Sequence, residues 1–249
     1  MTDRPPPRLE WQTAELVEGR RETGTARTLV FIGPSWTSYL PGQHVDVRLT
    51  AEDGYTAQRS FSIASSDGAG RFELTVQRVP GGEVSPYLVD DMQIGDQVEV
   101  RGPIGGWFAW RPENSDPVLL VAGGSGVVPL MAMVRERDRA GSRVPFRLVY
   151  SVRSADEAIY ADELATRSSS REALTVGWVY TRSVPQGHER PPSRLDGSDL
   201  SDLSWANHVT PRCYVCGPTG FVEAASQLLL DLGHPAETIR TERFGPTGE

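Results

Sequence analysis

The hydrophobic pattern changes its period near the middle of the chain, and this change constrains the fold more than any other feature. Before residue 111, short apolar runs alternate with turn sequences such as Pro41-Gly42, a pattern typical of β-strands. After residue 117, continuous apolar runs alternate with segments of helical period, which indicates βαβ units. The polar stretch Arg111–Asp116 separates the two patterns. The sequence therefore predicts two domains, residues 1–113 and residues 114–249.

The first domain is predicted to be a small antiparallel β-barrel. Five or six strands at this short spacing favour a barrel or a sandwich, and closure removes exposed strand edges. The apolar runs that predict the strands are Thr28–Gly33, Gln43–Leu49, Arg59–Ser65, Phe72–Arg78 and Gln97–Gly102.

The second domain is predicted to be an α/β domain with a mostly parallel sheet. Helices are expected at Val127–Ala140, at Phe221–Leu232, and from the capping box Ser154-x-x-Glu157 to about Thr166. Pro185–Arg194 is expected to be a loop. The predicted strands are Val118–Ala122, Phe146–Val152, Leu174–Thr181, Arg212–Cys216 and Ile239–Phe244.

Composition excludes several kinds of chemistry. All 25 basic residues are arginine, so a Schiff-base lysine and a Walker-A lysine are excluded. Two cysteines are too few for a four-thiolate zinc site or iron–sulfur cluster within the chain. The net charge of -8 argues against nucleic acid and anionic membrane surfaces as partners.

Neither end of the chain nor its interior predicts membrane insertion. Met1–Glu22 is rich in proline and charge and lacks the apolar centre of a signal peptide. The longest apolar stretch, Pro117–Val134, is interrupted by glycines and is unlike a membrane span. The expected compartment is the cytoplasm.

The segment Gly123–Pro129 follows a predicted buried strand and opens a helix. Backbone N–H groups of Gly124, Ser125 and Gly126 are therefore predicted to bind phosphate at a helix N-terminus. Pro129 stands where a third Rossmann glycine would be, and Val127 breaks a hydrolase G-x-S-x-G pattern. A tight strand-to-helix turn is the alternative.

The second predicted strand of this domain ends with Ser151-Val152-Arg153. A hydroxyl and a guanidinium suit a 2′-phosphate better than the acidic residue that holds a ribose 2′-OH. Arg182 and Arg194 are candidates for the same phosphate, which favours NADP. The alternative is that all three arginines are solvated loop charges.

Cys213 and Cys216 are spaced like a redox C-x-x-C pair. On a strand, residues i and i+3 point to opposite faces, so the two thiols are predicted not to meet. Cys216, Gly217 and Pro218 lie at the carboxyl end of a strand, where open α/β sheets bind ligands. Cys213 is expected to be a packing residue.

Two motifs in the first domain carry little meaning by themselves. Gly81–Ser85 precedes a short apolar helix and is a second possible phosphate loop, although a turn with a cap at Ser85 explains it nearly as well. Arg59–Ser62 is an amphipathic strand. The histidines lack metal-ligand spacing and are interpreted as surface or loop residues, and no metal site is predicted; they are His44, His188, His208 and His234.

In this order, the motifs resemble those of the ferredoxin–NADP+ reductase family, from about Trp11 to Gly248. The family fold is a flavin-binding antiparallel barrel followed by a nicotinamide-nucleotide α/β domain. The motifs that carry the resemblance are Arg59-x-Phe61-Ser62, Gly81-Gly82-x-x-Ser85, Gly102-Pro103-x-Gly105, Gly123–Pro129, Cys216-Gly217-Pro218 and Glu242–Gly245.

The resemblance implies a role for each matching residue. Ser62, Cys216 and Glu242 are the expected catalytic residues: Ser62 near flavin N5, Cys216 beside the nicotinamide C4, and Glu242 as a group that helps proton delivery. The expected FAD contacts are Arg59, Ser60, Phe61, Val76, Gly81, Gly82, Val84, Ser85 and Phe244. The expected nicotinamide-nucleotide contacts are Gly124, Ser125, Gly126, Ser151, Arg153, Arg182, Arg194, Cys216, Gly217 and Pro218.

The chain departs from the family pattern at three points. Phe61 replaces the usual tyrosine, which removes a phenol hydrogen bond to flavin. Phe244 replaces a terminal tyrosine and is followed by Gly245–Glu249, which puts simple stacking on flavin in doubt. Many relatives also fuse an iron–sulfur domain, and the cysteine count of this chain excludes one, so the electron acceptor is expected to be a separate protein.

The resemblance implies an FAD-dependent oxidoreductase that uses NADPH, with NADH possible. It is expected to pass electrons to a separate one-electron carrier, a ferredoxin-like protein or an oxygenase component. Two alternatives stay open. One is a flavin or quinone reductase that acts on small acceptors, and the other is a non-catalytic subunit that binds nucleotide and flavin.

Overall fold

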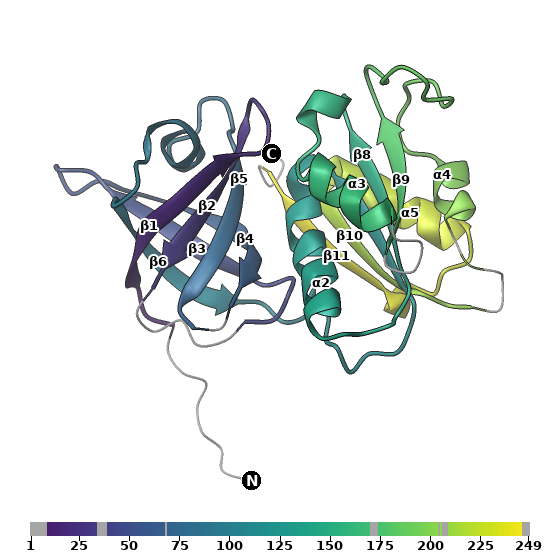
Figure 1. Ribbon diagram of the computed structural model, residues 1–249, viewed down its shortest axis with the longest axis horizontal. Helices are drawn as coiled ribbons and strands as arrows, with labels where there is room; N and C mark the ends of the chain where they lie inside the picture. The colour runs from purple at the N-terminus through teal and green to yellow at the C-terminus, as the bar shows by residue number, and fades with distance from the viewer. Residues whose placement is uncertain are drawn as a thin grey trace, which may run out of the picture.

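The computed structural model describes residues 9–33, 39–67, 69–169, 174–203, 205 and 209–245. These residues form two bodies that lie side by side (Figure 1), a β-barrel followed by a parallel sheet with helices on both faces. The predicted fold class is confirmed. The polar stretch Arg111–Asp116 connects the last barrel strand to the first strand of the sheet.

Six antiparallel strands close the barrel in the order β1-β2-β5-β4-β3-β6. Val45, Val47 and Phe72 alternate inward with other apolar side chains and fill its interior. A short helix, α1 (Val84–Pro86), continues into a π-helical turn and covers the barrel with Leu88. The strands are β1 (Gln12–Arg21), β2 (Ala26–Ile32), β3 (His44–Thr50), β4 (Thr56–Ser66), β5 (Arg71–Gln77) and β6 (Gln97–Ile104).

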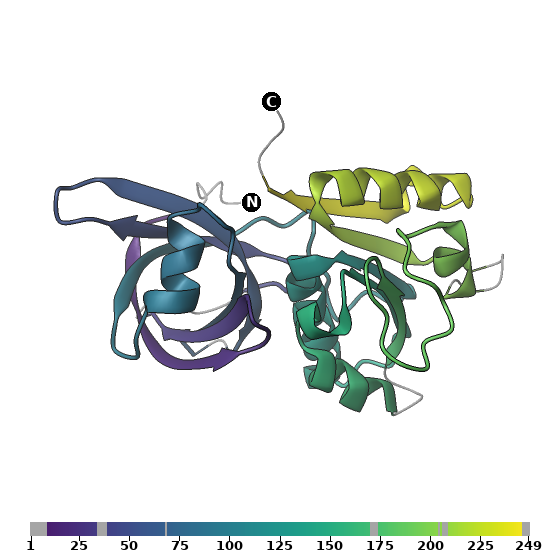
Figure 2. The ribbon, with the colours of Figure 1, turned by 90° about the horizontal axis from the view of Figure 1, so that it is seen from above.

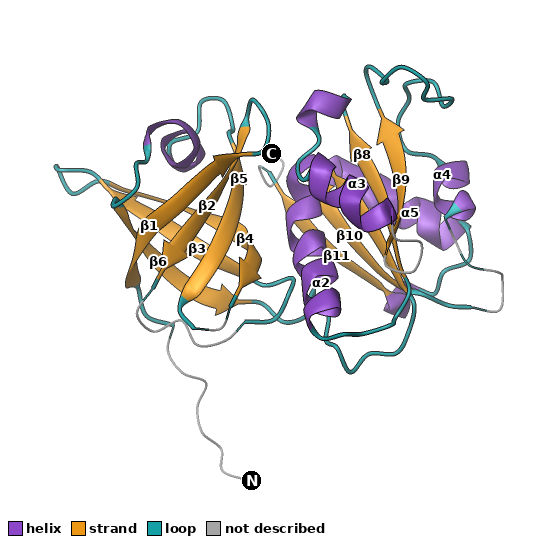
Figure 3. Cartoon of the chain, viewed as in Figure 1, coloured by secondary structure: helices purple, strands orange, loops and turns teal. Residues whose placement is uncertain are grey.

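The second body is a five-stranded parallel sheet in the order β11-β10-β7-β8-β9. Helices α2 (Val127–Arg139) and α3 (Ala161–Ser169) cover one face, and α4 (Gly197–Asp202) and α5 (Thr219–Asp231) cover the other (Figure 3). The strands are β7 (Val118–Gly123), β8 (Phe146–Val152), β9 (Leu174–Tyr180), β10 (Arg212–Pro218) and β11 (Ile239–Phe244). None of the described helices is long and apolar enough to cross a membrane.

Three elements differ from the sequence predictions. Strand β1 was not predicted, because only Ala14 and Leu16 are fully buried along it. The predicted helix start at Ser154 is wrong: a 3-10 turn follows Ser154, whose side chain caps nothing, and α3 begins only at Ala161. Helix α4 was missed because its capping box uses Asp196 and an aspartate at the third position rather than a serine and a glutamate.

Helix α2 joins the two bodies. It packs against strand β4, on the side of the sheet that faces the barrel (Figure 2). Ala26 and Ala64 of the barrel belong to the same buried cluster as Val127 and Met131 of α2. Small side chains at the barrel surface allow this close approach, so the relative position of the two domains is set by a packed interface.

The turn between β7 and α2 generates a stability prediction. A Cβ atom on Gly126 would lie 2.1 Å from the carbonyl oxygen of Cys216, so Gly126→Ala must displace backbone. We expect a loss of about 3 kcal/mol in the free energy of unfolding, measured by denaturant titration. Gly220→Ala in α5, where nothing lies within 4 Å, is the matched control and should be neutral or stabilising by up to about 1 kcal/mol. Equal stabilities would contradict the close approach.

Candidate active site

A cleft of about 380 Å³ opens where the carboxyl end of β11 meets barrel strands β3 and β4. Both domains contribute to its walls, which matches the usual position of ligand sites at domain boundaries. Its lining residues are Gly42, His44, Ser60, Ser62, Gly105, Gly106, Trp107, Phe108, Thr241, Glu242, Arg243 and Phe244.

Two of the three predicted catalytic residues, Ser62 and Glu242, line this cleft, and the third, Cys216, is buried beside Glu242. The Ser62 hydroxyl on β4 donates a hydrogen bond to Glu242 Oε1 on β11, at 3.5 Å. Cys216 on β10 is the register partner of Glu242 in the parallel pairing of β10 with β11. The contact between Ser62 and Glu242 therefore joins the barrel directly to the edge of the sheet.

Burial sets the protonation states of these groups. It raises the pKa of Glu242 from 4.5 to about 7, although the Ser62 hydrogen bond opposes the shift. The carboxyl group can therefore hold or release a proton near neutral pH. Burial, together with the neighbouring Glu242, raises the pKa of the Cys216 thiol well above 9. Cys216 is therefore a neutral thiol and not a thiolate nucleophile.

His44 is a cleft residue that the sequence interpretation missed. It lies on β3 directly opposite Ser62, rather than on the surface or in a loop. Burial lowers its pKa below 6.5, although Asp46 opposes the shift, so the imidazole is neutral at neutral pH. In the sequence, His44 stands out only because it precedes Val45, whose side chain points into the barrel. That position alone does not show that His44 faces a cleft, because the pairing of β3 with β4 must also be known.

The other histidines lie elsewhere. His188 packs edge-on against Tyr180, with ring centroids 4.9 Å apart. His234 Nδ1 lies 3.9 Å from Cys213 Sγ. His208 falls outside the described residues. Within the described ranges, no three His, Cys, Asp or Glu side chains gather in a way that could hold a metal ion.

Asp46 supports the barrel wall of the cleft. It accepts hydrogen bonds from the Ser60 hydroxyl at 2.7 Å and from Arg101 Nη2 at 2.6 Å. Although burial opposes it, these hydrogen bonds hold the pKa of Asp46 below its usual value. Ser60 is thereby fixed on the same side of β4 as Ser62.

Arg59 and Phe61 alternate with these serines and do not line the cleft. The Arg59 side chain is exposed, and its guanidinium donates to the Gln58 carbonyl at 2.6 Å. Within the part of the chain that the structure describes, it forms no ion pair with a carboxylate, so it is free to bind an anion. Phe61 is half-buried and packs on the barrel core.

The loop before α1 fits a phosphate ligand. Gly81 has a φ of +74° and open space around it. Helix α1 starts after Glu83 without a side-chain cap. Ser85 does not cap this helix: it lies inside it, and its Oγ accepts from the Val79 N–H at 3.1 Å. The backbone N–H groups here and the free Arg59 guanidinium suit a pyrophosphate.

Two predicted flavin contacts are limited by burial. The side chains of Val76 and Val84 are fully buried in the barrel core. Only their backbone atoms can reach a ligand. Gly82 is less enclosed and packs against the Val79 carbonyl. Flavin binding at these positions stays a prediction.

The loop between β7 and α2 has both structural and chemical features. A Cβ on Gly123 would lie 2.6 Å from the Phe221 ring, and Gly126 packs against the Cys216 carbonyl, so packing explains these two glycines. Gly124 adopts a φ of +55°, and Ser125 is partly exposed. A 3-10 turn, Gly124–Gly126, leads directly into α2, and the Val127 N–H donates to the Gly124 carbonyl. This turn has no side-chain cap, so its own N–H groups are the ones that can face a phosphate.

The arginines predicted to bind a 2′-phosphate lie at the carboxyl edge of the sheet. The Arg182 N–H donates to the Arg153 carbonyl at 2.9 Å, and both side chains are exposed. Arg153 has a long ion pair of 3.7 Å with Glu157. Arg194 is exposed and follows Ser193, whose N–H bonds to Tyr180 at the end of β9.

Ser151, two residues before Arg153, is nearly buried, with 7% of its surface exposed.

Phe244 lies at the carboxyl end of the edge strand β11. It is the register partner of Pro218, one residue beyond Gly217. Phe244 is 37% exposed and lines the cleft, so its ring is accessible to a ligand.

The prediction that the two thiols do not meet is confirmed. Both cysteines are free. Cys213 belongs to the cluster under α5, and Cys216 belongs to the cluster on the opposite face of the sheet. Cys213 is fully buried, and burial raises its pKa to about 12, which suits a packing residue.

Two family models match the two bodies of the chain. The oxidoreductase FAD-binding domain matches residues 14–108, and the oxidoreductase NAD-binding domain matches residues 120–227. The chain belongs to the ferredoxin reductase-like family of flavoprotein oxidoreductases. This flavoprotein reductase therefore carries an FAD-binding domain and an NAD(P)-binding domain.

Known relatives share this division. The glycine betaine monooxygenase reductase subunit of Pseudomonas aeruginosa is 31% identical to the reductase over 235 residues, which cover 91% of this chain and 62% of the relative. The ferredoxin–NAD(P)+ reductase component of naphthalene 1,2-dioxygenase/salicylate 5-hydroxylase systems in a Ralstonia species is 31% identical over 212 residues, with 84% and 62% covered. The chain thus spans about 62% of the length of these relatives.

Solved structures share the fold of the reductase. The FAD/NAD-binding domain of nitric oxide dioxygenase from Vibrio cholerae superposes with a TM-score of 0.83 at 24% identity. The match covers 94% of this chain and 99% of that domain. Both the barrel and the parallel sheet are therefore part of a known arrangement.

The raised pKa of Glu242 predicts a pH-dependent stability. The folded state keeps a proton that the unfolded chain releases between pH 4.5 and about 7, so Glu242 lowers stability as pH rises through this range. The unfolding free energy of Glu242→Gln, relative to that of the unsubstituted protein, should therefore rise by about 2 kcal/mol from about pH 5 to about pH 8. This rise is smaller than the free energy that corresponds to the whole pKa shift, because the carboxyl group is partly exposed.

Thermal and denaturant unfolding of the protein without cofactor measure this gain. Glu237→Gln on the exposed turn before β11 is the matched control for removing a carboxylate near the same strand. A Glu242→Gln difference that does not vary with pH would contradict the raised pKa.

Proposed function

We propose that this protein is an FAD-dependent NADPH oxidoreductase that delivers electrons to a separate one-electron carrier, a ferredoxin-like protein or an oxygenase component. The observation that carries this function is the contact of Ser62 with Glu242 at the boundary between the flavin and nucleotide domains, with the buried Cys216 next to Glu242 on the neighbouring strand. A hydride donor and its acceptor must be held together at such a boundary.

When bound, FAD would supply the hydride acceptance and the single-electron release. The residues of the chain would bind the cofactors, orient them and supply a proton to a ligand in the cleft. Arg59 and the Gly81–Ser85 backbone would hold the FAD pyrophosphate, and Ser125 with its flanking glycines would hold the nicotinamide-side phosphates. These roles rest on an Arg59 guanidinium that forms no ion pair with any described carboxylate, on the open glycine at Gly81 and on the uncapped turn Gly124–Gly126 before α2.

Ser62 and Glu242 form the proton-handling part of the site. The Ser62 hydroxyl donates to the Glu242 carboxylate. When Glu242 is protonated, the hydrogen bond can reverse, so that Glu242 donates to Ser62 and the Ser62 hydroxyl donates to a ligand in the cleft. With its pKa near 7, Glu242 exchanges this proton at neutral pH. Cys216 contributes a neutral, buried thiol that shapes the nicotinamide side of the site.

The preference for NADPH rests on the arginines at the carboxyl edge of the sheet. Arg153 and Arg182 follow neighbouring strands and expose their guanidinium groups. No acidic side chain stands at the end of β8, where Arg153 follows Val152. A 2′-phosphate would form charge-assisted hydrogen bonds with these groups.

The proposed acceptor is a separate protein because two relatives are named as a reductase subunit of a monooxygenase and a reductase component of dioxygenase and hydroxylase systems. The chain spans part of their length, so this comparison supports the role of the matched region.

Purified protein tests the function directly. We expect a visible flavin band after FAD is added, and anaerobic bleaching of that band by NADPH.

Two outcomes would change the proposed function. Absence of a flavin band after FAD addition would contradict flavin binding, and a flavin that NADPH does not bleach would indicate a non-catalytic subunit. Rapid steady-state reduction of small quinones, with no response to ferredoxin or an oxygenase component, would assign a small-acceptor reductase instead.

The arginine pair predicts the nucleotide preference. Arg153→Ala and Arg182→Ala should each lower kcat/KM for NADPH about tenfold, since one charge-assisted contact of about 1.5 kcal/mol is lost. The values for NADH should stay within about twofold. Arg143→Ala is the matched control, an exposed arginine in the loop that leads into the opposite end of β8. Equal losses with both nucleotides would exclude a 2′-phosphate contact.

A further inference from the structure

Tyr160 has an unusual backbone conformation for its residue type. Among the described residues it is the one non-glycine residue with a positive φ, +63°. This left-handed region is strained for a bulky side chain. Tyr160 lies between the loop that follows Arg153 and the first residue of α3, and only 3% of its surface is exposed. Contacts of its side chain must therefore offset the strain.

The hydroxyl of Tyr160 makes its contact in the other domain. It donates a hydrogen bond to Thr75 Oγ1 on barrel strand β5. The Thr75 and Thr28 hydroxyls lie 2.7 Å apart, and Thr28 Oγ1 donates to Glu22 Oε1 at 2.6 Å. Both threonines are buried. The chain of hydroxyls ends on a carboxylate, which orients every donor in one direction.

The ring of Tyr160 is held from the other side by Arg135 of α2. The guanidinium lies 4.5 Å from the ring centroid and donates to Glu163 of α3 at 2.6 Å. It also donates to the Ala64 carbonyl of β4 at 3.1 Å. Burial raises the pKa of Tyr160 to about 12, so the phenol keeps the proton that it donates. Ring and hydroxyl together bridge the two domains.

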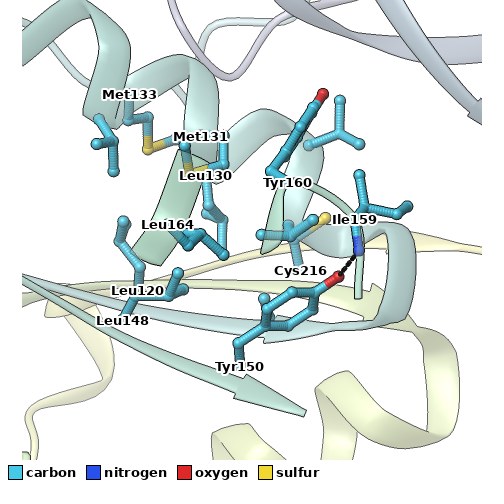
Figure 4. Packing of buried hydrophobic residues seen from close by; sticks show 14 of the residues in the cluster. Leu120, Leu130, Met131, Met133, Leu148, Tyr150, Ile159, Tyr160, Leu164 and Cys216 are labelled. Carbon is cyan, nitrogen blue, oxygen red and sulfur yellow. Dashed lines mark hydrogen bonds between the residues drawn. The ribbon is translucent and has the colours of Figure 1, made fainter. Parts of the chain in front are cut away.

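Tyr150 provides a contrast within the same cluster (Figure 4). It is also a fully buried tyrosine, and its hydroxyl accepts from the Ile159 N–H at 3.2 Å. The contact fixes the same loop, but it stays within the nucleotide domain. Figure 4 shows the Tyr160 hydroxyl pointing away from Tyr150. One hydroxyl thus anchors the loop, and the other ties it to the barrel.

The link joins two segments that the proposed function uses. The loop before Tyr160 begins at Arg153, and Thr75 immediately precedes Val76 on the flavin-domain strand. We propose that Tyr160 is a positioning residue, whose hydrogen bond to Thr75 locks the nucleotide domain onto the barrel and so sets the approach of nicotinamide to flavin. The structural link between the domains does not depend on the proposed function, but its effect on hydride transfer rests on it.

Amide hydrogen exchange of the protein without any cofactor tests the lock. In Tyr160→Phe, exchange should rise about tenfold in β5 and at the start of α3, on both sides of the interface. In the matched variant Tyr150→Phe, the rise should be confined to the nucleotide domain. Thr75→Val should show the same rise in β5 and α3 and, because Thr75 also bonds Thr28, a further rise in β2. Adding Tyr160→Phe to Thr75→Val should change exchange little, since the contact that the two residues share is already lost. An unchanged β5 in Tyr160→Phe would overturn the lock.

Stopped-flow reduction tests the consequence. With FAD bound, Tyr160→Phe should lower the limiting rate of flavin reduction about tenfold, while half-saturation by NADPH changes less than about twofold. Tyr150→Phe should keep the limiting rate. Equal rates in the two variants would show that the lock does not position the reactants. If NADPH did not reduce the flavin bound to the unsubstituted protein, the proposed function would be wrong. The hydrogen-exchange results would still show whether Tyr160 links the two domains.

Discussion

The parallel pairing of β10 with β11 is the constraint on which the site depends. Parallel neighbours end at the same edge of a sheet, so Glu242 and Phe244 reach the cleft beside the barrel, with Cys216 buried next to Glu242. Strand β11 is only partly buried along its length, so the register, more than its own hydrophobicity, defines its position. A slip of one residue would turn Glu242 to the other face and break its contact with Ser62.

The register of β11 brings Glu242 to Ser62 because the interface between the two domains is fixed. The Ser62–Glu242 hydrogen bond joins residues 180 positions apart in the sequence, and the packing of α2 against β4 helps to keep them within reach. Ala64 lies within the buried cluster of the nucleotide domain, and Arg135 donates to its carbonyl. Packing and hydrogen bonding therefore act on the same short stretch of β4 that carries Ser62.

Hydrophobic period was sufficient to predict the two domains and most of their strands, because alternation and buried runs are local properties. Long-range contacts account for the failures. The start of α3 was misplaced because Tyr160 adopts a left-handed conformation that is stabilised by Thr75, 85 residues away. His44 was missed because its proximity to Ser62 follows from strand register. The resemblance predicted that Ser62, Cys216 and Glu242 share a site, but the raised pKa of Glu242 follows from burial, which no spacing in the sequence reveals.

The arginines separate into two groups once their partners are known. Arg48, Arg101, Arg135 and Arg190 each form an ion pair of 2.6 Å with a carboxylate and hold structure together. Arg59 on strand β4 and Arg153 and Arg182 in the loops after β8 and β9 are exposed, and the ranges that the structure describes give them at most one long ion pair. A guanidinium stays charged at any physiological pH. In a chain of net charge -8, these exposed guanidinium groups are local positive charges that can attract an anionic ligand.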